Sequence, residues 1–278
     1  MEQQQQTTFE IKCLESLGYD CLHSKNLHIL PKTDLYPSTL ALISGTSIVF
    51  RSIDKQTIVR DPINTKGIGS IAIHPKGHVI AVGEKSPTKS TVKPKILLYS
   101  WPEVKLIGEL EGASEKTVSY LTFAPLSSSN SVDLLASVSS APDFMLTLWN
   151  WQEEKIVLRN KAYGQDTYKV TFSPYIEGQL CSAGVGHIKF WTMASTFTGI
   201  KLQGQLGRFG RTPISDIECY VMLDDGRVLS GSEWGNILQL VLKKYVCMHV
   251  CMYVCMYVCM YVCMYVYVCA SFCVCARL

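Results

Sequence analysis

The sequence predicts an all-β protein, an incomplete β-propeller of about five blade units that do not close into a ring. Three observations predict this fold: an internal repeat of about 40–50 residues, apolar and polar residues that alternate over short segments, and turn residues between those segments. A repeat of about four short strands is typical of a propeller blade. Because one blade cannot bury its faces alone, we expect the blades to stack around an axis.

Three copies of the repeat align, at residues 67–110, 117–160 and 167–193. Each opens with a short alternating strand that ends at an x-Pro pair: His74-Pro75, Ala124-Pro125 or Ser173-Pro174. Proline ends a strand without removing an internal ladder hydrogen bond. A strand of small residues follows, and each copy closes with a strand that carries a large aromatic residue: Tyr99, Trp149 or Trp191.

Two less regular copies flank these three. Residues 214–240 keep the Asp225-Gly226 turn and the "LSGS" strand, with Leu240 at the aromatic position and no outer strand. Residues 40–61 read as two or three strands. The sequence therefore divides into a polar leader at 1–17, a propeller fragment at 18–242 and a low-complexity tail at 243–278.

Composition narrows the class of protein. The formal net charge of +3 is too small to predict nucleic acid or an acidic membrane surface as a partner. The leader has neither the basic nor the apolar region of a signal peptide. The cysteines before the tail form no CxxC pair, which favours reduced thiols in a cytosolic protein; they are Cys13, Cys21, Cys181 and Cys219.

The tail repeats Cys-Met-Tyr-Val, a period of four that matches neither a strand nor a helix. A repeated TGTA tetranucleotide encodes this peptide, so we interpret the tail as read-through sequence without a selected function. One alternative is a membrane span, because residues 245–275 carry no charge and follow Lys243 and Lys244. A zinc array is a weaker alternative, because standard sites use CxxC pairs rather than cysteines spaced every four residues.

The repeat resembles that of WD-repeat proteins. Asp143 precedes Trp149 by the step that this family uses, whereas Val185-Gly186 precedes Trp191 and Trp234 takes the place of the aspartate in the last copy. The Gly-His pair that usually opens a repeat is missing. The resemblance therefore implies that the hydrogen-bonded His–Ser–Asp–Trp network of regular blades is mostly absent.

Three stretches carry a closer resemblance: "GYDCLHSKNLHIL", "GHIKFWTMASTFTGIKLQGQLGRFG" and "ISDIECYVMLDDGRVLSGSEWGN". From about Gly18 to Asn236 the chain resembles the N-terminal propeller of a large cilia- and flagella-associated WD-repeat protein of the motile axoneme. The resemblance implies a non-catalytic scaffold that helps to tether an inner dynein arm to the doublet microtubule, in the cytoskeleton of the cilium or flagellum.

Two other readings remain open. The stretch "IHPKGHVIAVGE" is similar to repeats of the echinoderm microtubule-associated protein-like family, which would also place the chain on microtubules. If the tail is made and inserts, the chain would instead be a tail-anchored membrane protein with a cytosolic β domain. We expect axonemal proteins as partners, and neither nucleic acid nor a small-molecule substrate.

No catalytic, cofactor-binding or metal-binding residue is predicted. The glycines of "GQLGRFG" lack the Lys-Ser/Thr of a phosphate loop, so we expect a loop between blades. The motif that holds His74 and His78 is interpreted as a surface turn, because further metal ligands are not evident. No nucleophile elbow or metalloprotease motif frames a catalytic serine or histidine.

Two features could instead contact a partner. Since strand neighbours point to opposite faces, we expect Trp149 to face the core and Trp151 to face outward or to pack on a loop. The lysines of "EKSPTKSTVKPK" could attract acidic tubulin tails, but a solvated insertion is the favoured interpretation.

Overall fold

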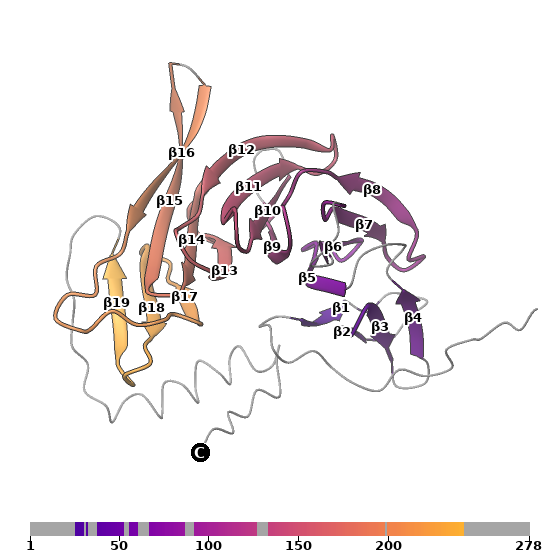
Figure 1. Ribbon diagram of the computed structural model, residues 1–278, viewed down its shortest axis with the longest axis horizontal. Helices are drawn as coiled ribbons and strands as arrows, with labels where there is room; N and C mark the ends of the chain where they lie inside the picture. The colour runs from indigo at the N-terminus through magenta and orange to yellow at the C-terminus, as the bar shows by residue number, and fades with distance from the viewer. Residues whose placement is uncertain are drawn as a thin grey trace, which may run out of the picture.

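The computed structural model describes residues 26–30, 32, 38–52, 56–60, 67–86, 92–126, 133–197 and 199–241. In this part the chain forms five antiparallel sheets, which follow one another in sequence order and lie side by side in an arc (Figure 1). The prediction of an all-β repeat protein with about five blade units is therefore confirmed. The leader at 1–17 and the whole tail at 243–278 lie outside the described residues.

Within each sheet the strands are paired in chain order. Sheet 1 contains β1 (Leu27–Leu30), β2 (Thr39–Ser44), β3 (Ser47–Arg51) and β4 (Gln56–Arg60). Sheet 2 contains β5 (Gly67–Ile73), β6 (Val79–Lys85), β7 (Ile96–Ser100) and β8 (Leu106–Leu110). Sheet 3 contains β9 (Val118–Phe123), β10 (Leu134–Ser139), β11 (Met145–Asn150) and β12 (Lys155–Lys161). Sheet 4 contains β13 (Thr167–Phe172), β14 (Gln179–Gly184), β15 (His187–Thr196) and β16 (Gly199–Leu206). Sheet 5 contains β17 (Tyr220–Met222), β18 (Arg227–Gly231) and β19 (Ile237–Val241).

The two flanking copies differ in how well the sequence predicted them. Residues 40–61 hold most of β2 together with β3 and β4, and β1 adds a fourth strand upstream of the predicted copy. Sheet 5 has three strands among the described residues, as expected for a copy without its outer strand. The x-Pro pairs act as predicted, since β5 ends at Ile73 and β13 ends at Phe172, each two residues before the proline.

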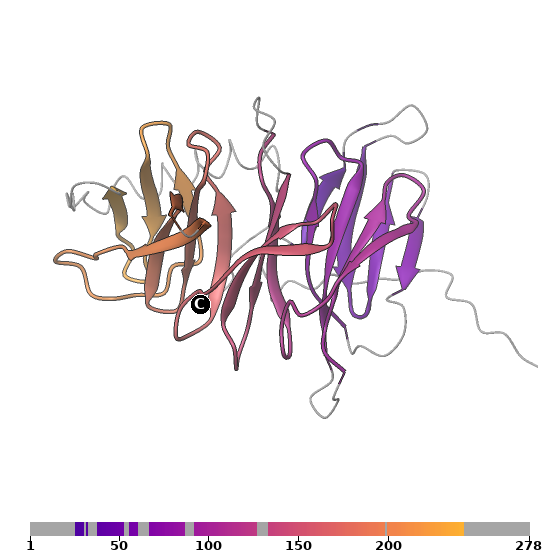
Figure 2. The ribbon, with the colours of Figure 1, turned by 90° about the horizontal axis from the view of Figure 1, so that it is seen from above.

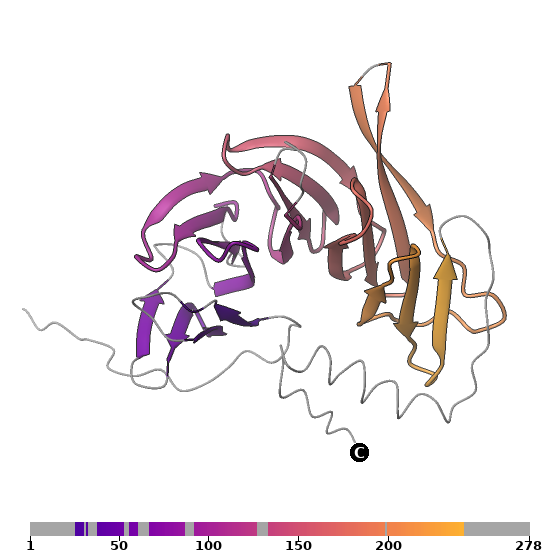
Figure 3. The same ribbon diagram turned by 180° about the vertical axis from the view of Figure 1, so that it is seen from behind.

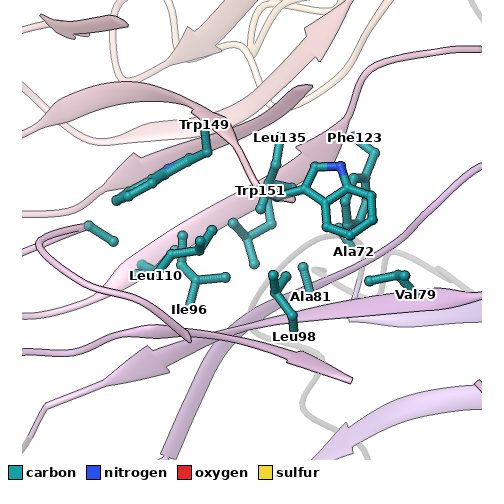
Figure 4. Packing of buried hydrophobic residues seen from close by; sticks show 13 residues of the cluster. Ala72, Val79, Ala81, Ile96, Leu98, Leu110, Phe123, Leu135, Trp149 and Trp151 are labelled. Carbon is teal, nitrogen blue, oxygen red and sulfur yellow. The ribbon is translucent and has the colours of Figure 1, made fainter. Parts of the chain in front are cut away.

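The core lies between neighbouring sheets rather than within one sheet. Figure 4 shows Ala81 and Leu98 of sheet 2 facing Leu135 and Trp149 of sheet 3, and all four are at most 2% exposed. Similar buried clusters join sheet 1 to sheet 2, sheet 3 to sheet 4 and sheet 4 to sheet 5. Each sheet therefore buries its face only by stacking on the next one, as a repeat architecture requires.

Glycine allows the inner strands of sheets 2 and 3 to approach closely. A Cβ atom at Gly69 of β5 would lie 2.3 Å from the carbonyl oxygen of Val118 in β9. At Gly83 of β6 it would lie 2.7 Å from a side-chain carbon of Val118. Next to these glycines, Ser70 Oγ donates a 3.0 Å hydrogen bond to the carbonyl of Val118. Small residues are therefore required where the inner strands meet.

The arc is open. Sheets 1 and 5 lie at its two ends, and Figures 1 and 3 show no described strand that bridges the gap between them. The prediction of an unclosed array is confirmed. In the described part of the chain, no helix is long and apolar enough to cross a membrane.

The hairpin of β15 and β16 departs from the outline of the arc. Its strands have 10 and 8 residues, and their pairing runs from Lys189↔Leu206 to Thr196↔Gly199. Figure 1 shows the far end of the hairpin projecting beyond the outer strands of the other sheets, and Figure 2 shows the arc from above with the hairpin in front of sheet 4. This length was not predicted from the sequence.

Candidate functional site

The buried tryptophans of sheets 3 and 4 each form a side-chain hydrogen bond. The indole N–H of Trp149 donates to Ser137 Oγ at 2.8 Å, and that of Trp191 donates to Ser182 Oγ at 2.8 Å. In sheet 3, Ser139 Oγ also donates to the carboxylate of Asp143 at 2.9 Å. The expectation that this network is mostly absent is therefore wrong for the Trp–Ser pair in these two sheets. The signal that was overlooked is the serine shared by "LLASVSS" and "QLCSAG".

His74 is a buried link between sheets 2 and 3, which corrects its interpretation as part of a surface turn. Its side chain is inaccessible to solvent, and its Nε2 lies 2.6 Å from Asp133 Oδ2, just before β10. The backbone N–H of Lys76 donates to His74 Nδ1, so the neutral imidazole must carry its proton on Nε2 and donate it to Asp133. His78 is exposed as predicted, and its ring lies 4.4 Å from that of His74.

The surroundings of His78 lower its pKa. The largest cause is partial desolvation, and the neighbouring His74 and Lys76 contribute less. Within the described ranges, no group of three or more histidine, cysteine, aspartate or glutamate side chains could hold a metal ion. The pair His74 and Asp133 is therefore a hydrogen-bonded contact between sheets.

Trp151 packs beside this pair, on the turn that holds His74, which agrees with the second of its two expected positions and excludes the outward one. It is 7% exposed, and its ring lies 5.7 Å from that of His74 and 5.9 Å from that of Phe123. Figure 4 shows Trp151 beside Phe123. Residues two apart along a strand share a face, so the alternation argument was misapplied to this pair, and Trp149 and Trp151 lie in the same buried cluster. Trp149 faces the core as predicted and is 1% exposed.

Gly204, the first glycine of "GQLGRFG", makes room for Trp191 and Lys189. Gly204 lies within β16, where a Cβ atom would meet Cε of Lys189 at 2.4 Å and the Trp191 ring at 2.7 Å. The Lys189 ammonium lies 3.9 Å from the centroid of that ring, a cation–π contact. The prediction of a loop between blades is right only after Leu206, since the motif begins inside a strand.

The lysine loop falls partly outside the described residues, which omit 87–91. Of its lysines, Lys93 pairs with Glu115 at 2.7 Å, and Lys95 pairs with Glu109 at 2.8 Å and Glu111 at 2.7 Å. Hydrogen bonds to these two carboxylates raise the pKa of Lys95. These two ammonium groups are already neutralised, which favours the solvated insertion over a tubulin contact.

A polar junction that the sequence did not reveal joins sheets 4 and 5. Asp216 accepts hydrogen bonds from the Tyr168 hydroxyl at 3.2 Å and from the backbone N–H of Gly186 at 2.9 Å. Lys169 Nζ donates to the carbonyl of Tyr220 at 2.7 Å, and burial lowers the pKa of Lys169. Burial, together with the nearby Asp216, raises the pKa of Tyr168 to about 12. These groups are engaged between sheets, so they stabilise the arc.

Large apolar side chains reach solvent at many places on the described surface, and two of these places lie at turns between strands. Phe197 and Ile200 occupy the end of the β15–β16 hairpin, with relative exposures of 107% and 55%. Trp234, at 57%, lies in the turn between β18 and β19. Single exposed apolar residues are common on protein surfaces, so these positions alone do not define a binding site. The polar side chains described above hold the sheets together.

Comparison with curated proteins identifies the homologous region. The chain is 46% identical over 224 residues to cilia- and flagella-associated protein 44 of Mus musculus, a match that covers 80% of this chain. It is 49% identical over 173 residues to the protein of the same name from Chlamydomonas reinhardtii, covering 62% of this chain. The chain is homologous to a WD-repeat region of cilia- and flagella-associated protein 44. It spans only 11% and 10% of the lengths of these two relatives.

Other comparisons agree with this assignment. Echinoderm microtubule-associated protein-like 2 of Homo sapiens is 26% identical over 79% of this chain and 32% of its own length, a weaker match than to cilia- and flagella-associated protein 44. The solved WD40 repeats of RRP9 match with a TM-score of 0.54 and 16% identity, over 80% of this chain and 65% of that one, which shows the propeller fold alone. No protein-family profile matches the chain.

Proposed function

We propose that the chain is a non-catalytic scaffold in the axoneme of motile cilia and flagella. The observation that carries the proposal is the homology to cilia- and flagella-associated protein 44, at 43–49% identity in a mouse, a green alga and a trypanosome. The names of these relatives associate them with cilia and flagella. A binding role also suits a repeat array, because stacked sheets present extended surfaces to partners.

The scaffold would act by holding its binding surfaces in fixed positions. Sheets 2 and 3 are joined by Ser70 and His74, and sheets 4 and 5 by Lys169 and Asp216. Such contacts resist sliding of one sheet past the next, so a load applied at one surface reaches another. We propose that this rigidity serves to tether an inner dynein arm to the doublet microtubule.

The absence of catalysis is part of the proposal. The indoles of Trp149 and Trp191 are occupied in hydrogen bonds to serines, and Gly204 of "GQLGRFG" packs against the Trp191 ring. A purified chain should therefore hydrolyse neither nucleotides nor peptides. Hydrolysis that co-purifies with the protein and disappears after a point substitution would contradict this.

Disruption of the gene in a ciliated cell tests the tethering role. We expect cilia of normal length that beat abnormally, with inner dynein arms lost or displaced when the axonemes are imaged by electron tomography. Re-expression of the protein should restore both features. Normal arms and normal beating in cells that lack the protein would refute the tethering role.

The weaker similarity to the echinoderm microtubule-associated protein-like family supports a second candidate function, direct binding to microtubules. A pelleting assay with purified microtubules separates the two. A tethering scaffold should need other axonemal proteins to bind, whereas a microtubule-associated propeller should pellet with bare microtubules.

A further inference from the structure

We propose that the end of the β15–β16 hairpin is a docking element that inserts Phe197 into an apolar pocket on an acidic protein surface. The first observation is its position. The hairpin leaves the outline of the arc, and its far end projects away from the neighbouring sheets in the views of Figures 1 and 3.

The second observation is that the hairpin is held firmly at both ends. Near its end, strand pairing continues to Thr196↔Gly199, and Thr196 Oγ1 donates a 2.6 Å hydrogen bond to the Gly199 carbonyl. At its root, Asn160 of β12 donates a 3.0 Å hydrogen bond to the carbonyl of Leu202. A preorganised projection loses little conformational entropy on binding, which favours affinity.

The third observation is the apolar character of the projecting end. Phe197 is fully exposed, and Ile200, three residues along, is 55% exposed. Because Phe197 stays exposed in the folded chain, its side chain gains no burial free energy on folding. An aromatic anchor that fills a pocket on a partner recovers that energy and is typical of interface hot spots.

The positive charge of the hairpin region indicates the kind of partner that it can bind. Between Glu177 and Asp216 the sequence has no carboxylate, whereas three cationic side chains there are exposed: Lys201, Arg208 and Arg211. Lys201 is exposed and pairs across the hairpin with Ala194, close to the projecting end. A pocket rimmed by Asp or Glu would complement this ammonium, which steers association and selects against basic surfaces. The occupant is therefore an acidic protein surface with an apolar pocket.

This inference rests on the proposed function only in that a scaffold must hold a partner. The test uses the full-length endogenous protein in ciliated cells, with a photoreactive benzoylphenylalanine in place of Phe197. The control carries the same group in place of Tyr175, which is 57% exposed in another loop. After irradiation, the cross-linked partner peptide is sequenced by mass spectrometry.

We expect one discrete adduct from position 197, on an acidic segment, that is absent from position 175. Lys201→Glu in the same protein should reduce its yield at least about tenfold, because one charge pair is reversed. A synthetic copy of the mapped peptide should bind the wild-type protein at least about tenfold more tightly than Phe197→Ala. Unchanged melting of both variants would show that each is folded.

Four results would overturn the inference: no adduct above the control, an adduct on a neutral or basic segment, an adduct on lipid, or a yield that Lys201→Glu leaves unchanged. Each of these is compatible with an axonemal protein that tethers dynein through another surface. Failure of the docking element is thus distinct from failure of the proposed function, which localisation and beating report.

Discussion

His74 Nε2 and Asp133 Oδ2 lie 2.6 Å apart, although 59 residues separate them in the sequence. The histidine belongs to the turn after β5, and the aspartate lies just before β10, so their hydrogen bond connects sheet 2 to sheet 3. The inner strands of the same two sheets also meet at Gly69 and Val118. Together these contacts give the junction its fixed geometry.

Asp133→Ala should destabilise the chain by about 1–2 kcal/mol, because it leaves the buried His74 N–H without its acceptor. Urea unfolding at pH 7.5 measures the change. Asp225→Ala is the matched control, since Asp225 bonds only within its own exposed turn to Arg227 in the contacts observed. An equal loss of stability in both variants would show that the bond between sheets contributes nothing specific.

Gly69→Ala should destabilise the chain by about 1–3 kcal/mol, because the new methyl group would overlap the Val118 carbonyl and force β5 away from β9. Gly231→Ala provides the comparison, since a Cβ atom there meets no heavy atom within 4 Å. Thermal unfolding of the two variants checks the prediction. A Gly69→Ala variant with the melting temperature of the wild type would contradict the close approach of sheets 2 and 3 at this glycine.

Trp151→Ala should cost about 3–5 kcal/mol, because it opens a cavity against His74 and Phe123. Trp234→Ala removes an indole that is 57% exposed and should change stability little. Denaturant titrations of both variants measure the contrast. A small loss of stability of similar size in both variants would contradict the burial of Trp151.

Acidification should weaken the chain through His187. Its ring is 1% exposed and stacks on Tyr163, its Nδ1–H donates to the Val185 carbonyl, and its buried Nε2 has no partner. Desolvation, aided by Lys189, lowers its pKa below the ordinary 6.5, while the Val185 carbonyl and Asp216 oppose this. The unfolded state therefore binds more protons below about pH 6.5, so stability falls as pH falls.

Stability at pH 7.5 and at pH 5.5 measures this effect, in a range where most carboxylates stay ionised. His187→Gln removes the titrating group and should reduce the loss between the two values. A loss of the same size in the variant and the wild type would assign the pH dependence to other groups.

The sheets could be predicted from sequence because their signals are local. Alternation, the x-Pro pairs and the Asp225-Gly226 turn act within a few residues of the chain. They indicate where strands begin and end, and the strands observed agree with them. The position of His74 depends on packing between sheets, which no local pattern encodes. Its role was misjudged because a turn next to proline is usually exposed, whereas here the next sheet covers it.

The projecting hairpin and the polar junction at Asp216 were missed for a related reason. β15 continues to Thr196, past Trp191, the aromatic position where the repeat was expected to end. The segment "TFTGIK" has no strong turn pair to mark the end of the hairpin. Asp216 gains its role from Tyr168 of sheet 4, 48 residues away. Contacts of this range follow from the arc and cannot be read from one repeat.

Fractionation of cilia tests the central claim most directly. The endogenous protein is tagged, motile cilia are isolated, and their membranes are removed with detergent. The account predicts that the tagged protein remains with the demembranated axoneme, as a protein-bound scaffold should. Release of the protein with the membrane fraction, or its absence from motile cilia, would contradict it.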